Sequence, residues 1–243
     1  MKKLLLATSL SLLLSISSAQ EFATRLYTPK DGLVQAEVYC VTQGPQGYLW
    51  VGTLGGISRF DGLEFKNYTE QDGLISNSIY QMQWFNDTLF ILTKEGVDMM
   101  VDGKFTNLFH DKNINFMMGR IKITPQYRYA IGHNYDYYFF LDIKTGKITH
   151  FPKKLQLVGN MGVTMTDTSF IIGKDSSLYE MPFGDTVYTK IAKFNNTVGR
   201  IRYFNKTIFM GLDFQTSERI IPGYVKLVRK PNGSGYNLSL IHI

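Results

Sequence analysis

Cysteine is almost absent from this chain of 243 residues, since Cys40 is the only one. A single cysteine cannot form an intrachain disulfide, so the fold must be stabilised by packing alone. Cys40 lies in the apolar run 38–41, where a thiol is typical of a small buried hydrophobe rather than a nucleophile. The sequence therefore excludes the class of small disulfide-stapled domains.

Motifs for metal binding and catalysis are also missing. The four histidines show no close metal-ligand spacing: His110, His133, His150 and His242. There is no Gly-x-Ser-x-Gly nucleophile motif, and the glycines at 52, 55 and 56 lie between predicted strands rather than before a helix, which excludes a phosphate-binding loop. Asp61 and Asp102 each precede a glycine in a turn and do not form a catalytic pair. The sequence predicts no cofactor, no metal site and no catalytic residue.

Charge of one sign is not concentrated in any segment. The chain has 26 Lys and Arg against 20 Asp and Glu, a formal net charge of +6, and the densest basic cluster, residues 226–230, is short. Nucleic-acid binding requires a basic patch or stripe, so no nucleic-acid partner is predicted. A basic surface that meets acidic glycans is compatible with this composition.

Only one long apolar run is present, at residues 4–16. Lys2 and Lys3 precede it, and the small residues 17–19 follow it. This order is typical of a secretory signal peptide, and the run is too short for a membrane-spanning helix of roughly 20 apolar residues. We predict a signal peptide over residues 1–19, cleaved after Ala19, and an exported mature chain.

The chain contains a repeat of about 40 residues. Asp-Gly-Leu occurs at 31–33 and again at 72–74. A pair made of an apolar residue and a following glycine or leucine recurs at steps of 38 to 41 positions: Val51-Gly52, Ile91-Leu92, Ile131-Gly132, Ile172-Gly173 and Met210-Gly211. An aromatic residue ends each unit at steps of 41 to 43 positions: Tyr27, Tyr68, Phe109, Phe151 and Phe194. Two ladders with nearly the same step indicate a repeat architecture.

Each unit divides into about four short strands. In the first unit the strands are predicted at 37–42, 48–53, 56–60 and 64–68, and Asp61-Gly62 favours a hairpin turn between the last two. Four antiparallel strands in about 40 residues is the size of a propeller blade. The predicted fold class is all-β, an incomplete β-propeller of four-stranded blades with about four to five blades present. A β-sandwich is the alternative, but it gives no reason for a fixed period.

The first unit also resembles a known family. Its segments Asp-Gly-Leu at 31–33, Gly-Tyr-Leu-Trp-Val-Gly-Thr at 47–53 and Gly-Gly-Ile-Ser-Arg-Phe-Asp-Gly at 55–62 resemble the repeat of two-component regulator propellers. These propellers form the periplasmic sensor half of bacterial histidine kinases, many of them hybrid systems of Bacteroidetes. The resemblance is specific in the first unit, partial in the second, confined to the ladders in later units, and spans roughly residues 21–230.

This resemblance implies a function. Family members carry propellers followed by a β-sandwich, one membrane helix and a kinase or other output, and characterised members sense oligosaccharides. It implies that this chain is the periplasmic ligand-sensing module of a two-component protein, with a small-molecule or oligosaccharide ligand. The full-length protein would be a histidine kinase, attached to the membrane through a missing C-terminal helix, and a homodimer is compatible with this arrangement.

The end of the chain departs from the family pattern, because the sandwich, the membrane helix and the kinase are absent. We therefore expect residues 20–237 to be part of a longer propeller. Residues 24–27 match 65–68, the last strand of a blade, and are expected to complete a final blade that the chain lacks. Residues 238–243, Leu-Ser-Leu-Ile-His-Ile, match the translation of a transposase adaptor used in sequencing, which predicts a non-native tail.

One segment is the candidate ligand site: His133, Asn134, Tyr135 and Asp136. It follows Gly132 at a place where other units have a tight turn, and in propellers this turn lies on the face of the connections between blades. Aromatic and amide groups there can stack on a sugar and hydrogen-bond to it. The alternative is that residues 137–141 simply form the next strand. Trp50 is expected in the core, because its repeat partner is Phe90.

Two other functions remain open. One is a secreted propeller hydrolase or lyase that acts on polysaccharide; paired carboxylates for such cleavage are compatible with the sequence, but no motif indicates them. The other is a scaffold propeller with no small ligand.

Overall fold

The computed structural model describes residues 24–124, 126, 128–133, 138–152, 155, 162–195, 197–215, 220–231 and 235–241. Two short 3₁₀ helices, η1 (Pro29–Asp31) and η2 (Glu70–Asp72), accompany the strands. No helix in these ranges is long and apolar enough to cross a membrane. The predicted signal peptide, residues 1–19, lies outside the described residues.

The strands form five four-stranded antiparallel sheets, each made of four strands that follow one another along the chain. We call these sheets blades 1 to 5. Blade 1 contains β1 (Val38–Gln43), β2 (Leu49–Thr53), β3 (Gly56–Phe60) and β4 (Phe65–Tyr68). Blade 2 contains β5 (Ile79–Phe85), β6 (Thr88–Thr93), β7 (Gly96–Val101) and β8 (Lys104–His110). Blade 3 contains β9 (Asn115–Ile123), β10 (Arg128–His133), β11 (Tyr138–Asp142) and β12 (Lys147–His150). Blade 4 contains β13 (Val163–Met165), β14 (Ser169–Lys174), β15 (Ser177–Pro182) and β16 (Thr189–Lys193). Blade 5 contains β17 (Thr197–Phe204), β18 (Thr207–Gln215), β19 (Ile220–Arg229) and β20 (Tyr236–Ile241).

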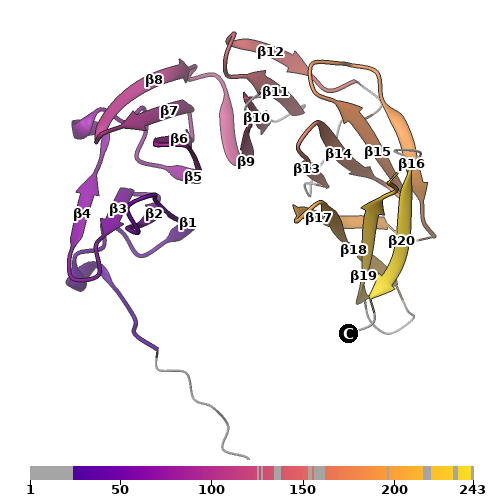
Figure 1. Ribbon diagram of the computed structural model, residues 1–243, viewed down its shortest axis with the longest axis horizontal. Coiled ribbons are helices and arrows are strands. Elements are labelled where there is room, and N and C mark those ends of the chain that lie inside the picture. Colours follow the sequence, from indigo (N-terminus) through magenta and orange to yellow (C-terminus); the bar gives the residue numbers. More distant parts are fainter. Residues whose placement is uncertain are drawn as a thin grey trace, which may run out of the picture.

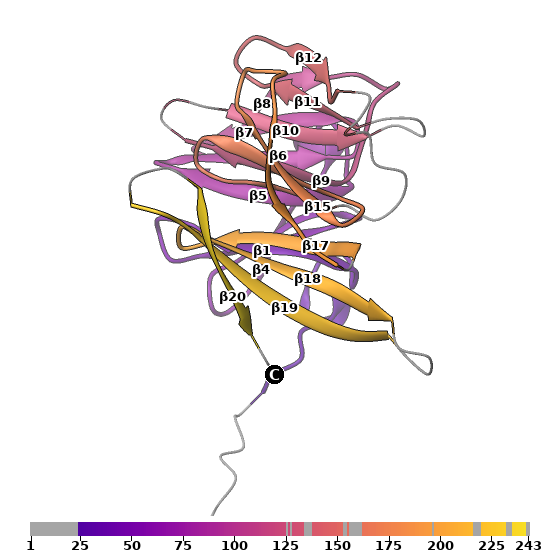
Figure 2. The ribbon, with the colours of Figure 1, turned by 90° about the vertical axis from the view of Figure 1, so that its right-hand side faces the viewer.

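The blades are arranged side by side in an open arc (Figure 1). The first strand of each blade (β1, β5, β9, β13 and β17) lies on the inner side of the arc, and the fourth strand lies on the outer side. We call the inner side the inner wall. Blades 1 and 5 face each other across the gap, and Figure 2 shows blade 5 in front of blade 1 when the arc is viewed from its side. The prediction of an incomplete, all-β propeller of four-stranded blades is confirmed.

The Asp-Gly-Leu signature is a capped turn that leads into a blade. The Asp31 carboxylate accepts hydrogen bonds from the backbone N–H of Thr28 (2.8 Å) and from its hydroxyl (2.9 Å), which forms a capping box around η1. Gly32 then adopts a φ of 104°, a left-handed conformation that favours glycine, and Leu33 is buried. Blade 2 repeats this turn with Thr69, Asp72, Gly73 and Leu74.

An asparagine fastens the first signature turn to the outer strands of blade 1. Asn67 on β4 donates to the carbonyl of Gly32 (3.0 Å) and accepts from the Ser58 hydroxyl (2.6 Å). The same hydroxyl oxygen accepts from the backbone N–H of Val34 (2.9 Å). The side chains of two outer strands therefore satisfy backbone groups that the turn leaves unpaired.

Blade 2 makes the same connection with a carboxyl group in place of the hydroxyl. Asn107 on β8 donates to the carbonyl of Gly73 (3.2 Å) and to Asp98 (2.5 Å). The other Asp98 oxygen accepts from the backbone N–H of Ile75 (2.9 Å). Asp98 is fully buried, and this burial raises its pKa to about 6, although the hydrogen bonds from Ile75 and Asn107 act in the opposite direction.

The core consists of four apolar seams, one between each pair of neighbouring blades. In the seam between blades 1 and 2, Trp50 is 3% exposed, stacks on Tyr68 and meets Trp84 edge to face. Phe90, its repeat partner, is buried in the next seam. This confirms that Trp50 is a core residue. Cys40 borders the same seam, and burial raises the pKa of its thiol to about 11, as expected for a packing residue.

The N-terminal strand that the sequence predicts at 24–27 is not formed in this chain. Residues 24–28 have no regular secondary structure. Tyr27 instead packs against Phe60 and Phe65, with ring centroids 4.9 and 5.6 Å apart. Among the residues that the structure describes, no strand pairs with them.

The last six residues are predicted to be a non-native tail. Of these, residues 238–241 belong to β20, which pairs with β19 from Arg229↔Tyr236 to Tyr224↔Ile241. They therefore occupy the place of the fourth strand in blade 5. The fold does not show where residues 238–243 come from. Their proposed origin in a sequencing adaptor therefore stays a prediction.

Candidate functional site

The predicted ligand segment begins at the end of β10. His133 is the last residue of that strand and pairs with Tyr138 at the start of β11 and with Asn115 at the start of β9. Asn134, Tyr135 and Asp136 lie outside the described residues.

Because His133 pairs with Asn115, where the chain enters blade 3, the end of β10 lies at the end of the blade where the connection from blade 2 arrives. The alternative that the next strand follows directly is correct from Tyr138 onward, where β11 begins. A role of residues 133–136 in ligand binding stays a prediction.

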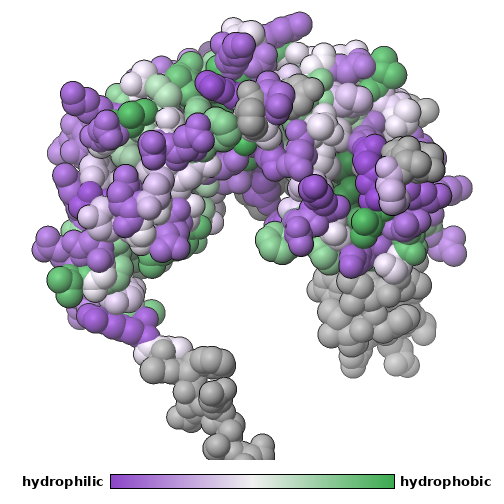
Figure 3. Space-filling view, in the orientation of Figure 1, coloured by the Kyte–Doolittle hydropathy of each residue, from purple (hydrophilic) through white to green (hydrophobic). Residues whose placement is uncertain are grey.

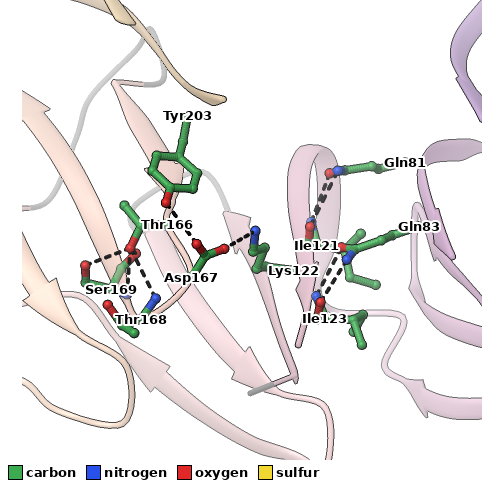
Figure 4. A network of polar contacts seen from close by, with 10 residues as sticks. All are labelled: Gln81, Gln83, Ile121, Lys122, Ile123, Thr166, Asp167, Thr168, Ser169 and Tyr203. Atoms are coloured by element: carbon green, nitrogen blue, oxygen red, sulfur yellow. Dashed lines mark hydrogen bonds and ion pairs between the residues drawn. The ribbon is translucent and has the colours of Figure 1, made fainter. Parts of the chain in front are cut away.

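A second group of polar residues lies along the inner wall, and the sequence analysis did not identify it. Gln81 and Gln83 on β5 reach across to β9 of the next blade (Figure 4). Each side-chain amide accepts from one backbone N–H and donates to the carbonyl of the same residue: Gln81 pairs with Ile121 at 2.9 and 3.5 Å, and Gln83 with Ile123 at 3.0 and 2.8 Å.

These two glutamines imitate a neighbouring β-strand. A first strand in a blade has a free edge on the inner side, and its N–H and C=O groups require partners. The paired amides satisfy two residues of that edge on β9 and connect blade 2 to blade 3. Residues Gln81 and Ile121, and Gln83 and Ile123, are each separated by 40 positions, which is one repeat.

A carboxylate joins the next three blades. Asp167, between β13 and β14, accepts from Lys122 on β9 (2.9 Å) and from the Tyr203 hydroxyl on β17 (2.9 Å) (Figure 4). The hydrogen bond from Lys122 holds the pKa of Asp167 below its usual value, and the bond from Tyr203 acts in the same direction. Burial, together with the bond to Asp167, raises the pKa of Tyr203 to about 12.

The turn that carries Asp167 is held by its neighbours. The Thr166 hydroxyl oxygen accepts from the backbone N–H groups of Thr168 (3.2 Å) and Ser169 (3.0 Å). This arrangement projects Asp167 toward β9 on one side and β17 on the other. The carboxylate is about half exposed, so its contacts with blades 3 and 5 remain accessible to water or to a ligand.

The inner wall carries amide, ammonium, carboxylate and phenol groups. Among the residues that the structure describes, no three His, Cys, Asp or Glu side chains form a group that could hold a metal. Figure 3 shows hydrophilic and hydrophobic residues intermingled over the face of the arc, and hydrophilic residues cover most of it. A polar wall of amide, lysine, carboxylate and phenol groups can form hydrogen bonds to a polar ligand.

Part of this wall could have been identified from sequence. Gln81 and Gln83 alternate with Tyr80, Met82 and Trp84, which is the pattern of a strand with one polar face. The partners of these side chains lie one blade away, and the pattern contains no information about them. Asp167 lies between two threonines and has the sequence of an ordinary turn.

Comparison with known proteins supports the repeat. The family model described as two component regulator propeller matches residues 32–55. Histidine kinase P4 of Formosa agariphila is 47% identical over 47 residues, which cover 19% of this chain and 3% of that protein.

Solved structures show the same fold. The extracellular domain of a putative hybrid two component system from B. thetaiotaomicron superposes with a TM-score of 0.56 at 19% identity, over 88% of this chain and 35% of that one. The extracellular domain of a putative one component system from the same organism gives a TM-score of 0.58 at 14% identity, over 91% of this chain and 31% of that one. The chain therefore spans about a third of the length of these extracellular domains.

Proposed function

We propose that this chain, whose residues 32–55 match the model of the two component regulator propeller family, is the ligand-sensing module of a two-component signalling protein. The observation that supports the proposal is the agreement of a sequence comparison with a comparison of structures. A stretch of 47 residues is 47% identical to a histidine kinase, and the fold is similar to that of extracellular domains of signalling systems.

In this proposal the module is exported to the periplasm and acts in a protein attached to the inner membrane. The N-terminal segment, with two lysines before an apolar run, supports export. A membrane helix and a kinase region beyond the propeller would carry the signal inward. The kinase activity belongs to that region, and the propeller contributes no catalytic group.

The proposed ligand is a glycan or oligosaccharide. Residues 133–136 contain histidine, amide, phenol and carboxylate groups, and such groups stack on sugars and hydrogen-bond to them. The mechanism would be a population shift, in which the ligand binds one arrangement of the blades more tightly than another.

The inner wall supplies contacts through which such a shift could pass between blades. Gln81, Gln83, Lys122, Asp167 and Tyr203 join blades 2 to 5 through polar contacts on the inner wall. A ligand that exchanges hydrogen bonds with one of these groups would change the relative stability of neighbouring seams.

The proposal is tested with the intact gene in its source organism. Transcription of the genes that the system controls is measured during growth on a panel of purified oligosaccharides. We expect one class of oligosaccharide to induce transcription, and a deletion of residues 24–241 to abolish the induction. Induction that survives the deletion would contradict a sensing role for this region.

The site prediction has its own test. Substitutions Tyr135→Ala and Asp136→Asn in the intact protein should weaken binding of the inducing oligosaccharide about tenfold or more, the scale expected for loss of a stacked or charged contact. Thr145→Ala, in the turn between β11 and β12 of the same blade, is the matched control. Unchanged affinity in both loop variants would exclude this loop as the site.

A further inference from the structure

Blade 5 packs one of its faces against blade 4 and turns the other toward the gap of the arc (Figure 1). Ile201 on β17, together with Val225 and Leu227 on β19, is buried in the seam with blade 4. Because side chains alternate between the two faces of a strand, Arg202 and Lys226 project from the other face. We call this other face the open face of blade 5.

Three residues form a row across the open face of blade 5. Phe209 on β18 pairs with Arg202 of β17 on one side and with Lys226 of β19 on the other. Paired residues of neighbouring strands place their side chains on the same face, so the aromatic ring lies between two cations. Arg202 is exposed, and Phe209 and Lys226 are half-buried. Arg200, which is exposed and precedes the buried Ile201, adds a third cation to this face.

The cations of the open face have no acidic partner. Within the part of the chain that the structure describes, Arg200, Arg202 and Lys226 form no ion pair with a carboxylate. The guanidinium group of Arg202 donates to the backbone carbonyl of Ile201 (3.0 Å), which leaves several of its five donors for another group. The open face of blade 5 therefore suits a partner that carries carboxylates.

The face of blade 1 on the other side of the gap has a different character. Trp50 and Ile57 pack in the seam with blade 2, so the residues that alternate with them face the gap. These residues form two rows without any charge: Gln43, Leu49, Phe60 and Phe65 in one, and Val41, Val51, Ser58 and Asn67 in the other. Direct packing of blade 5 on blade 1 would bury the cations against this uncharged face without a counter-ion, which is costly.

A second copy of this chain is no better partner for blade 5. Its own blade 5 presents the same cations, and like charges across an interface repel. Its blade 1 presents the same uncharged rows. This chain spans about a third of the similar extracellular domains, and a protein of that length has residues for further blades.

Blades 3 and 4 show how a cation on a first strand is paired across a seam. Lys122 on β9 projects toward blade 4, because Ile121 and Ile123 pack toward blade 2. Its ammonium group lies 2.9 Å from the carboxylate of Asp167, in the turn between the first two strands of blade 4. Arg202 projects from the same side of β17, which is the first strand of blade 5. A carboxylate in the corresponding turn of a following blade would therefore meet Arg202.

We propose that the open face of blade 5 docks a further blade of the same polypeptide, which places carboxylates opposite Arg202 and Lys226 and an apolar side chain opposite Phe209. Charge-assisted hydrogen bonds would then pair these cations as Asp167 pairs Lys122. A ring of five blades that closes directly between blades 5 and 1 is thereby excluded. This docking surface concerns the assembly of the propeller and does not depend on the proposed ligand.

Chemical cross-linking of the intact protein encoded by the source gene identifies the partner. A carbodiimide joins a lysine amine to a carboxylate that touches it, and mass spectrometry identifies the joined peptides. We expect Lys226 to be joined to an Asp or Glu outside residues 24–241, and Arg202→Lys to gain a second link to the same region. Lys144, exposed in a turn of blade 3, is the control and should form no link to that region.

Mixing proteins that contain heavy and light nitrogen isotopes distinguishes a link within one chain from a link between two copies. Links that join heavy to light chains would assign the face to a second copy and overturn the proposal. Links from positions 202 and 226 to carboxylates next to blade 1 would overturn it as well, and so would the absence of any link from both positions.

Thermal melting of the same intact protein tests the charge of the partner without a cross-link. Because carboxylates would face position 202, Arg202→Glu should melt about 2–4 °C below Arg202→Leu, and high salt should reduce this difference. Lys144→Glu and Lys144→Leu should melt alike. An apolar partner predicts that Arg202→Leu melts above wild type, and that result would overturn the proposal. Equal melting of wild type and both variants, or a difference that appears only when glucuronate is added, would also overturn it.

Discussion

Ser58 and Asp98 occupy the same place in two successive blades and perform the same task with different chemistry. Each accepts a hydrogen bond from the backbone of the signature turn and contacts the asparagine of the outer strand. The serine does this without charge. The aspartate carries an ionisable group into a fully buried position, where burial raises its pKa to about 6.

This difference predicts a pH dependence of stability. The pKa of Asp98 in the folded state, about 6, lies above its ordinary value of 3.8, so the folded state retains the proton over that interval. Stability is therefore lost as the pH rises from about 4 to about 6, by up to about 3 kcal/mol at about 1.4 kcal/mol for each pKa unit. Urea unfolding of wild type and Asp98→Ser across this range measures it.

We expect the unfolding free energy of Asp98→Ser, relative to wild type, to increase as the pH rises from 4 to 6.5. Asp102→Asn, in an exposed turn of the same blade, is the control and should show no such trend. A constant difference between Asp98→Ser and wild type at every pH would contradict the raised pKa.

Cys40 gives a second prediction at this scale. Because only the thiolate reacts, a thiol with a pKa of about 11 should be modified slowly at pH 7.5. We expect a maleimide to label the native protein at least about tenfold more slowly than the urea-unfolded protein, as measured by mass spectrometry. Equal labelling rates in the two states would show that the thiol is accessible and that burial does not raise its pKa.

At the scale of elements, the free inner edge of β9 is satisfied by side chains rather than by another strand. The amide groups of Gln81 and Gln83 each bond both the N–H and the C=O of one residue on that edge. These contacts join two blades that otherwise meet through apolar packing. The edge is thus protected from pairing with another chain.

Gln83→Leu should therefore destabilise the protein by about 1–3 kcal/mol, because it leaves the N–H and C=O of Ile123 unpaired in a partly buried position. Gln43→Leu on β1 is the matched control, since Gln43 is exposed and bonds only a nearby turn carbonyl. Chemical denaturation of the two variants provides the comparison. Equal stability of the two variants would show that the Gln83 side chain does not take the place of a neighbouring strand.

Most strand positions followed from sequence because each strand is bounded by local turn chemistry. The first blade was predicted at 48–53 and 56–60 and is observed at Leu49–Thr53 and Gly56–Phe60. The inner wall could not be predicted in the same way. Lys122, Asp167 and Tyr203 come from three blades, and a one-dimensional pattern does not specify which turn of one blade reaches the strands of two others.

At the scale of the whole molecule, large exposed apolar side chains gather on the two end blades and the segment before the first one. Within the described residues eight of the ten lie next to or on blade 1 (Leu26, Val38, Tyr39, Val41, Leu49 and Leu63) or on blade 5 (Phe204 and Leu238), and the other two are Val101 on blade 2 and Val187 on blade 4. Seams between neighbouring blades bury most large apolar side chains of the arc. The faces at the gap of Figure 1 have no blade packed against them in this chain.

Residues 20–237 expressed alone should consequently aggregate or fold poorly, because free apolar faces and strand edges promote association. Size-exclusion chromatography with light scattering and thermal melting would measure this. A monomer that melts in one cooperative transition would contradict the prediction. The intact protein from the source gene provides the comparison.

The proposed sensing role requires that this propeller binds the signal itself. The most direct measurement is calorimetric titration of the intact protein with the oligosaccharide that induces transcription. We expect saturable binding that requires residues 24–241 and is lost when they are deleted. An inducing oligosaccharide that does not bind, or that binds equally well after the deletion, would contradict it.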